Sequence, residues 1–294
     1  AFLIDKTGNF WLGQPFGTIK RFDKNSNTLT AYGTENGLPA PTTNEGMVVA
    51  FVNYIFEDSR GDIWFAAWDR GISRMNSKEA DQSKLFTNFN TQNGLSLNKI
   101  RCISEDREGN VLLGTFGNGL SIFKGERFIS FNIKDGLINN QVWGILEDRD
   151  KKLWFTTNEG LSIYNPSDKV FTNLKNIEGA SSNSIRPISA DKDGNIWMGT
   201  WGSKVIKYDW AKKRFIRDLP VNEVVFNHIS CIKVDSKNRV WIGSPVGLTL
   251  LDQNSGKITN YTKQDGLSEA DITCIFEDSK GTVWFGTRQK GINR

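Results

Sequence analysis

One spacing recurs seven times along this chain of 294 residues and constrains its fold more than any other feature. In each copy an aspartate is followed six residues later by a tryptophan, or in the third copy by a leucine. An aspartate can cap the backbone N–H groups of a tight turn, and the residues around the tryptophan are of types that favour strands. We therefore expect each copy to form a turn followed by a strand. The pairs are Asp5 and Trp11, Asp58 and Trp64, Asp106 and Leu112, Asp148 and Trp154, Asp191 and Trp197, Asp235 and Trp241, and Asp278 and Trp284.

The pitch of this repeat indicates the architecture. The tryptophan position advances by 42 to 53 residues from one copy to the next. A period of about 40–50 residues with several short strands per unit is typical of β-propeller blades, whereas helical repeats would show a 3.6-residue periodicity that the sequence lacks. The sequence therefore predicts an all-β, seven-bladed β-propeller with four-stranded antiparallel blades, in a single domain over residues 1–294. The blades are expected to begin near residues 1, 52, 100, 142, 185, 229 and 272.

Three further features refine this prediction. A small residue such as Gly13 or Gly199 stands two residues after the tryptophan, which is typical of closely packed inner strands. The last blade has sequence for only three strands, so we expect it to lack its outer strand and the chain to be a fragment of a longer multidomain protein. The segment 39–46, which other copies lack, is predicted to be a loop from its proline, threonine and glycine content.

Composition excludes several classes of function. The 37 basic and 33 acidic residues are spread along the chain and leave a net charge of +4, which argues against nucleic acid as a partner. No apolar run approaches the roughly 18 residues that a membrane span needs. Cys102, Cys231 and Cys274 occupy equivalent positions on three inner strands, and we interpret them as small buried residues rather than disulfides.

The blade pattern resembles the two-component regulator propeller repeat. Its marks are a Glu-Asp-x-x-Gly-x-aliphatic-Trp-Phe-Gly-Thr run, seen at residues 277–287, and Gly-Leu pairs between blades, as at Gly94-Leu95, Gly136-Leu137 and Gly266-Leu267. The resemblance covers essentially the whole chain. Local departures are Lys151 and Asn238 in place of the turn glycine.

The resemblance implies a sensor. Members of that family commonly form the extracytoplasmic sensor region of bacterial hybrid histidine kinases, often those that control polysaccharide use. It implies a periplasmic or cell-surface propeller that senses a ligand, such as an oligosaccharide or another small molecule. Neighbouring domains of the same longer protein are then the expected partners, and a homodimer of the full-length protein is a further expectation. No kinase machinery is present in this sequence, and fold alone does not fix function.

A binding site should appear where residues break the repeat, on the face that carries the turns between second and third strands and the connections between blades. Aromatic rings there can stack on sugars, and arginines can bind carboxylate or sulfate groups. The alternative is that these side chains fill the mouth of the channel or contact another domain. The candidate rim consists of Trp68, Asp69, Arg70, Arg101, Phe116, Trp143, Arg186, Trp201, His228 and Arg288.

Two other functions stay open. His228 is the only histidine, and Glu269 and Asp271 lie in the equivalent connection of the next blade, so a metal-assisted lyase resembling streptogramin lyase is the main alternative. A non-catalytic scaffold of a cell-surface assembly is the other. The run from Asp191 to Asn195 lacks the closing glutamate of a calcium loop, so we expect no metal there. We expect no catalytic residues and no cofactor.

Overall fold

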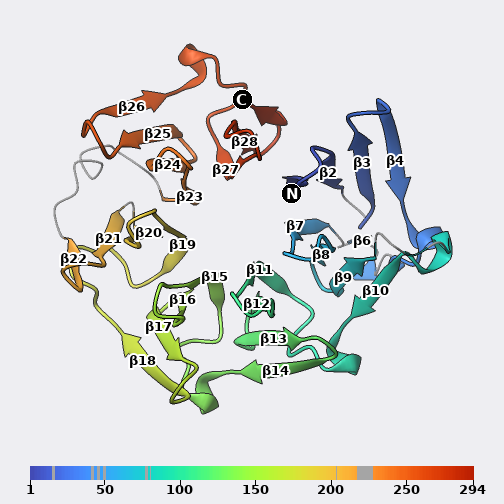
Figure 1. The fold of residues 1–294 in the computed structure, drawn as a ribbon, viewed down its shortest axis with the longest axis horizontal. Coiled ribbons are helices and arrows are strands. Elements are labelled where there is room, and N and C mark those ends of the chain that lie inside the picture. The colour runs from blue at the N-terminus through green and yellow to red at the C-terminus, as the bar shows by residue number, and fades with distance from the viewer. Residues whose placement is uncertain are drawn as a thin grey trace. The chain divides into compact units, whose positions relative to one another are not determined.

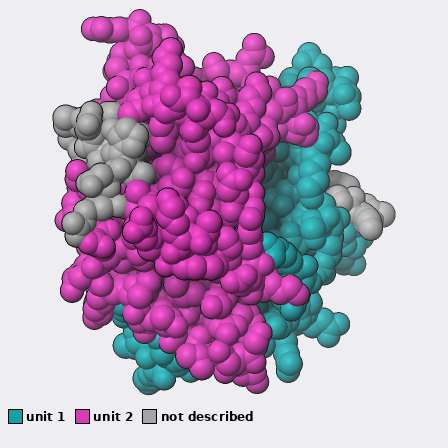
Figure 2. Space-filling view, turned by 60° about the vertical axis from the view of Figure 1, so that its left-hand side comes forward, with its two compact units in different colours: residues 1–142 teal, residues 143–294 magenta. Residues whose placement is uncertain are grey.

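The structure is a computed structural model that describes residues 1–14, 17–40, 43–44, 47–48, 51–76, 79, 81–202, 204–216 and 228–294. The chain divides into two compact units, residues 1–142 and residues 143–294, which Figure 2 distinguishes by colour. We call them unit 1 and unit 2 and describe each by itself. The single domain expected from the sequence stays a prediction.

Unit 1 contains three four-stranded sheets and a short hairpin among its described residues, and in each sheet the strands follow one another in chain order (Figure 1). Short 3-10 helices η1 (Thr34–Asn36), η2 (Gln82–Lys84), η3 (Thr91–Asn93) and η4 (Ile133–Asp135) lie in its connections. The strands are β1 (Phe2–Ile4), β2 (Phe10–Gly13), β3 (Ile19–Asp23) and β4 (Thr28–Tyr32); the hairpin β5 (Thr43–Asn44) and β6 (Met47–Val48); β7 (Val52–Glu57), β8 (Ile63–Ala67), β9 (Gly71–Met75) and β10 (Phe86–Phe89); and β11 (Ile100–Glu105), β12 (Val111–Thr115), β13 (Leu120–Lys124) and β14 (Arg127–Phe131).

Unit 2 contains three more four-stranded sheets and a last sheet of three strands, counted over the residues that the structure describes. The 3-10 helix η6 (Lys263–Asp265) precedes the last sheet. The strands are β15 (Val142–Glu147), β16 (Leu153–Thr157), β17 (Gly160–Asn165) and β18 (Val170–Leu174); β19 (Ile185–Ala190), β20 (Ile196–Thr200), β21 (Val205–Asp209) and β22 (Arg214–Ile216); β23 (Cys231–Val234), β24 (Arg239–Ser244), β25 (Gly247–Asp252) and β26 (Ile258–Tyr261); and β27 (Ile272–Glu277), β28 (Val283–Thr287) and β29 (Ile292–Asn293).

Seven successive antiparallel sheets of this topology make the fold a seven-bladed β-propeller, as far as the described residues go. The predicted fold class is confirmed, including the three-stranded last blade. The predicted loop at 39–46 is wrong for Thr43 and Asn44, which pair with Val48 and Met47 in the β5–β6 hairpin. Residues 41–42 and 45–46 of that segment lie outside the described part.

The repeated aspartate closes the turn between the first and second strands of a sheet. In the second sheet, Asp58 Oδ1 accepts hydrogen bonds from the backbone N–H groups of Arg60 and Asp62, at 3.0 and 2.9 Å. Its Oδ2 accepts a third from Trp64 Nε1, at 2.9 Å. The same indole bond, 2.7–3.1 Å long, forms in all six copies that have the tryptophan. The predicted backbone cap is confirmed, and the indole bond explains the fixed spacing of six.

The third residue after the aspartate adopts a left-handed backbone conformation. Gly61 has φ 86°, and the two residues that replace glycine, Lys151 and Asn238, both have φ 63°. The left-handed conformation is sterically unfavourable for any residue with a Cβ, although it is less so for asparagine than for lysine. The turn geometry is therefore kept even where the glycine is absent.

Small residues of the second strand allow the next sheet to approach. A Cβ added to Gly13 would lie 2.6 Å from Val52 Cβ, and one added to Gly243 would lie 2.8 Å from Ile272 Cγ2. Real Cβ atoms do not come so close, so the small layer predicted from the sequence is a packing requirement.

The hydrophobic core is distributed between neighbouring sheets rather than gathered in one place. In unit 2, Trp197 packs with Ile229, Ile232 and Val240 of the following sheet, and these side chains are at most 7% exposed. Trp241 packs in the same way against the sheet that contains Val283. These two tryptophans thus join their own turns to the next sheet, as expected for blades that cannot bury both faces alone.

The Gly-Leu pairs mark how one sheet connects to the next. The glycines that end η1, η3, η4 and η6 have φ between 93° and 109°, which a left-handed cap requires. Leu95 and Leu137, the leucines that follow two of them, are each 3% exposed. The three cysteines are free thiols. Over the described residues, no helix has the length and hydrophobicity to cross a membrane.

Candidate functional site

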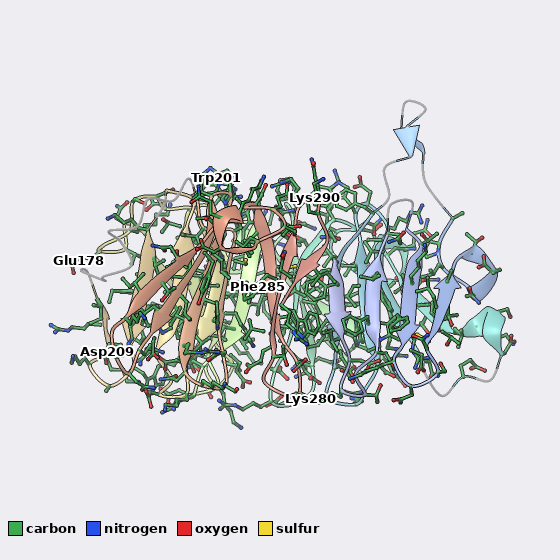
Figure 3. All side chains as sticks on the ribbon, turned by 90° about the horizontal axis from the view of Figure 1, so that it is seen from above. Glu178, Trp201, Asp209, Lys280, Phe285 and Lys290 are labelled. Atoms are coloured by element: carbon green, nitrogen blue, oxygen red, sulfur yellow. The ribbon has the colours of Figure 1, made fainter. Side chains whose placement is uncertain are left out.

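The turns between second and third strands lie at one end of the unit 2 sheets. Figure 3 shows Trp201, which follows β20, and Lys290, which follows β28, at that end. Asp209, the last residue of β21, and Lys280, in the turn between β27 and β28, lie at the opposite end, with Phe285 between. We call the first end the Trp201 end and the second the Asp209 end of unit 2.

Four candidate residues form one stack at the Trp201 end, which we call the stacked column. The guanidinium carbon of Arg186 lies 3.8 Å from the ring centre of Trp143 and 3.4 Å from that of Trp201. The ring of His228 stacks on Trp201 at 4.1 Å between centres and 29° between planes. Two groups this close to one ring centre must lie on its opposite faces, so the order is Trp143, Arg186, Trp201, His228.

Hydrogen bonds fix the column on the sheet framework. Trp143 Nε1 donates to Asn158 Oδ1 at 2.8 Å, and Ser184 Oγ donates to the same oxygen at 2.9 Å. The backbone N–H of Trp201 donates to Ser184 O at 2.8 Å. Asn158 and Ser184 therefore link β15 and β16 to the segment that carries Trp201, and neither was singled out from the sequence.

The column differs from the open stacking platform that the sequence suggested. Both faces of the Trp201 ring are covered, by Arg186 and by His228, although 44% of the residue is exposed. The exposed part is therefore the ring edge. Cation–π contacts are worth about 0.5–2 kcal/mol depending on desolvation, so a guanidinium between two indoles is held firmly. The roles of these residues in ligand binding stay predictions.

An ion pair adjoins the histidine at the end of the column. Arg288 Nε lies 2.5 Å from Asp271 Oδ2, and its backbone N–H donates to Asp271 O at 3.0 Å. The hydrogen bond to Asp271 raises the pKa of Arg288, and the negative charge of the Asp271 carboxylate raises it further. Burial lowers the pKa of His228, the charge of Arg186 lowers it further, and the Asp271 carboxylate opposes this shift. His228, Asp271 and Arg288 thus share one electrostatic environment.

The acidic residues proposed for the lyase alternative are partly engaged elsewhere. Glu269 Oε2 accepts a hydrogen bond from the backbone N–H of Gln289 at 2.7 Å, and Asp271 binds Arg288. Among the described residues, no group of three His, Cys, Asp or Glu side chains is arranged to hold a metal ion.

The remaining candidate residues lie in unit 1. Trp68 contacts Phe116, with 5.5 Å between ring centres, and stacks on Phe51 at 5.9 Å and 9° between planes. The guanidinium carbon of Arg101 lies 5.8 Å from the Trp68 ring and 5.7 Å from the Phe116 ring. Phe51 is 45% exposed and was missed in the sequence; its position just before an inner strand was the available signal.

Asp69 and Arg70 have separate contacts. Asp69 pairs with Lys99 Nζ at 3.3 Å. Arg70 is only 8% exposed and donates from Nη1 to Pro39 O at 2.5 Å, while Nε and Nη2 have no hydrogen-bond partner in the described part of the chain. Burial lowers the pKa of Arg70. Arg70 therefore ties the β8–β9 turn to the connection between β4 and β7.

Four segments match the family described as Two component regulator propeller, residues 94–117, 136–159, 179–202 and 266–289. Each segment begins at the glycine of a Gly-Leu or Gly-Ala pair in the connection between two sheets. Each ends two residues after the second strand of the sheet that follows. A curated relative, Histidine kinase P4 from Formosa agariphila, is 29% identical over 184 residues. That alignment covers 56% of this chain and 13% of the relative.

Solved structures share the fold. The extracellular domain of a hybrid two component system from B. thetaiotaomicron has a TM-score of 0.78 at 22% identity, over 99% of this chain and 39% of that one. A catalytically inactive virginiamycin B lyase from Staphylococcus aureus, solved with quinupristin, has a TM-score of 0.73 at 17% identity, over 99% of this chain and 92% of that one. The sheet topology is that of a seven-bladed β-propeller, and four of its segments match the two-component regulator propeller family.

Proposed function

We propose that this chain is the ligand-sensing propeller of the extracytoplasmic region of a bacterial two-component sensor. The family matches support this, as do the neighbours described as extracellular domains of hybrid two component systems. The chain spans 13% of the length of the curated kinase and 39% of the neighbouring sensor structure, so signalling chemistry belongs to other parts of a longer protein. Neighbouring domains of that protein and a second copy of it are the proposed partners.

The stacked column is the observation that carries the sensing role. It gathers aromatic, cationic and imidazole groups from positions where the repeat diverges, and the Asp271–Arg288 pair adjoins it. The exposed edge of Trp201 and the 59% exposed side chain of Arg288 offer an apolar surface and N–H donors at the same end of unit 2. Oligosaccharides present apolar ring faces and many hydroxyl acceptors, so we propose a poly- or oligosaccharide, or a similar polar small molecule, as the ligand.

A binding screen with two variants tests this proposal. Wild-type protein is applied to a glycan array, and hits are measured by isothermal titration calorimetry with Trp201→Ala and Arg288→Ala. We expect each variant to bind about tenfold more weakly or worse, because each removes a contact group worth about 1.4 kcal/mol or more. Val246→Ala is the matched control, since Val246 is 45% exposed in the corresponding turn after β24. Absence of any hit, or equal affinities for all variants, contradicts the proposal.

A lyase is the second candidate function. His228 lies close enough to Asp271 for the carboxylate to influence its pKa, and the virginiamycin B lyase fold matches almost the whole chain. Incubation with quinupristin and a divalent metal ion, followed by mass spectrometry, tests this reading. We expect no linearised product from wild-type protein; product that disappears in His228→Ala would favour the lyase. A non-catalytic scaffold of a cell-surface assembly is the third reading, and it predicts no small-molecule ligand at all.

A further inference from the structure

A cleft of about 320 Å³ opens at the Asp209 end of unit 2, between the β15–β18 sheet and the β19–β22 sheet. Its lining combines side chains of the turns β15–β16, β17–β18 and β21–β22 with side chains of the strands β16, β17, β18 and β21. No residue of the cleft belongs to the candidate rim. The lining includes the side chains of Asp148, Asp150, Asp168, Tyr208, Trp210 and Lys213.

Aromatic rings form one wall of the cleft. Tyr208 contacts Trp154 at 5.1 Å between ring centres and forms a T-shaped pair with Trp210 at 6.2 Å between ring centres. Ring faces carry negative quadrupole charge and attract cations, most strongly in tryptophan. Trp210 is half-buried, and the hydrogen bond from its backbone N–H to Asn195 Oδ1, at 2.9 Å, fixes its position on the β19–β22 sheet.

Three carboxylates line the cleft together with the ammonium groups of Lys152 and Lys213. Asp168 accepts hydrogen bonds from Asn165 and from the backbone of Val170, and Asp148 accepts them from backbone N–H groups of its own turn. The Asp150 side chain, by contrast, is 56% exposed. Burial raises the pKa of Tyr208, and the nearby charges of Asp148 and Asp150 raise it further.

An ammonium group of the chain itself occupies this environment. Lys213 Nζ lies 3.4 Å from the centre of the Trp210 ring and 3.7 Å from Asp150 Oδ2. The Lys213 side chain is 54% exposed, so its ion pair is solvated and weak, and a long flexible chain can leave it at little cost. The cleft therefore holds a cation that can exchange for another.

We infer that this cleft binds an organic ammonium or guanidinium group, and that Lys213 is the internal occupant which such a ligand displaces. The cation packs on the Trp210 ring and pairs with Asp150, as Lys213 does now. The group can belong to a small amine or to a lysine or arginine of a protein segment. This site is independent of the Trp201 end and of the proposed sensing role.

Calorimetric titration with cationic probes tests the inference. The probes are choline, Nα-acetyl-lysinamide, Nα-acetyl-argininamide and a lysine-containing peptide, with Nα-acetyl-norleucinamide as the neutral analogue. Lys213→Met removes the internal competitor, so we expect cations to bind about fivefold more tightly than to wild type. Adding Trp210→Leu or Asp150→Asn to Lys213→Met should weaken binding by about twofold to thirtyfold. Lys212→Met is the matched control, because Lys212 pairs with Asp209 and does not line the cleft.

Each outcome decides the inference. If Lys213→Met binds no cation more tightly than wild type, or if norleucinamide binds as tightly as lysinamide, the inference is wrong. If both Trp210→Leu and Asp150→Asn leave affinity unchanged while circular dichroism shows a folded protein, it is also wrong. A peptide that binds more than tenfold more tightly than choline identifies a protein segment as the natural source of the cation; equal affinities identify a small amine.

Discussion

Replacing Asp235 by asparagine tests whether the repeated turn depends on the charge of the carboxylate rather than on its shape. The Asp235 side chain is 0% exposed, and its Oδ2 lies 2.8 Å from Trp241 Nε1 and 2.7 Å from Arg239 Nε. Its Oδ1 accepts two backbone N–H groups. Asparagine can keep the backbone bonds, but its NH₂ group would then face the N–H donors of Trp241 and Arg239 without an acceptor.

The size of the effect follows from these contacts. Breaking a buried, hydrogen-bonded ion pair by removing one partner costs about 3–5 kcal/mol. Arg239 is 26% exposed and can regain water, so we expect the lower end, a fall of about 3 kcal/mol in the free energy of unfolding. Urea unfolding followed by tryptophan fluorescence at neutral pH measures it. The control is Asp252→Asn, because Asp252 Oδ1 accepts only backbone N–H groups, and we expect about 0.5 kcal/mol or less.

The pH dependence provides the refutation. Burial raises the pKa of Asp235, but the hydrogen bonds from Trp241 and Arg239 and the charge of Arg239 outweigh this and hold the pKa below 3.8. A depressed folded-state pKa contributes stability above the unfolded-state value, and this contribution is lost as the pH falls through the folded-state pKa. The gap between wild type and Asp235→Asn should therefore be complete at neutral pH and shrink below about pH 3.8. Equal losses for Asp235→Asn and Asp252→Asn, or a gap that does not shrink in acid, would refute the reasoning.

Three further predictions concern other parts of the chain. Lys151→Gly should raise the free energy of unfolding by about 0.5 kcal/mol, because lysine holds φ 63° there, whereas Asn238→Gly should gain less because asparagine tolerates this conformation and accepts a bond from Lys192 N–H; thermal unfolding of both variants checks this. Burial raises the pKa of the Cys102 thiol to about 12, so iodoacetamide at mildly alkaline pH should alkylate Cys102 only after unfolding, as mass spectrometry would show. The lowered pKa of His228 means that the folded state resists protonation, so stability should fall as the pH drops below 6.5 and His228→Gln should reduce this fall; an NMR titration midpoint at or above 6.5 would contradict it.

The blades could be predicted because their determinants are local and periodic. An aspartate, a positive-φ position and a tryptophan at fixed spacing define a turn and a strand, and repetition corrects for single departures such as Lys151. The β5–β6 hairpin occurs once in a segment without alternating apolar residues, so composition alone suggested a loop. A unique segment offers no second copy against which to check an interpretation.

The candidate site was predictable in its positions but not in its contacts. Aligning the repeats places Trp143 and Arg186 at equivalent positions of two inner strands, and it places Trp201 in the turn after a second strand. Whether these side chains stack, and in which order, depends on the distance between sheets, which the sequence does not specify. The contact between Trp210 and Lys213 was not predicted, because both residues lie in the turn between β21 and β22 and not on the face where the sequence predicts a binding site.

The stacked column restricts how a ligand can act at the Trp201 end. Since both faces of Trp201 are covered, a ligand either contacts the ring edge and Arg288 or takes the place of His228. In the first case His228 keeps its burial beside Arg186, and its pKa stays below 6.5. In the second case the imidazole moves into water and away from that positive charge, so its pKa rises toward 6.5. An NMR titration of this single histidine with and without ligand therefore distinguishes addition to the column from displacement within it.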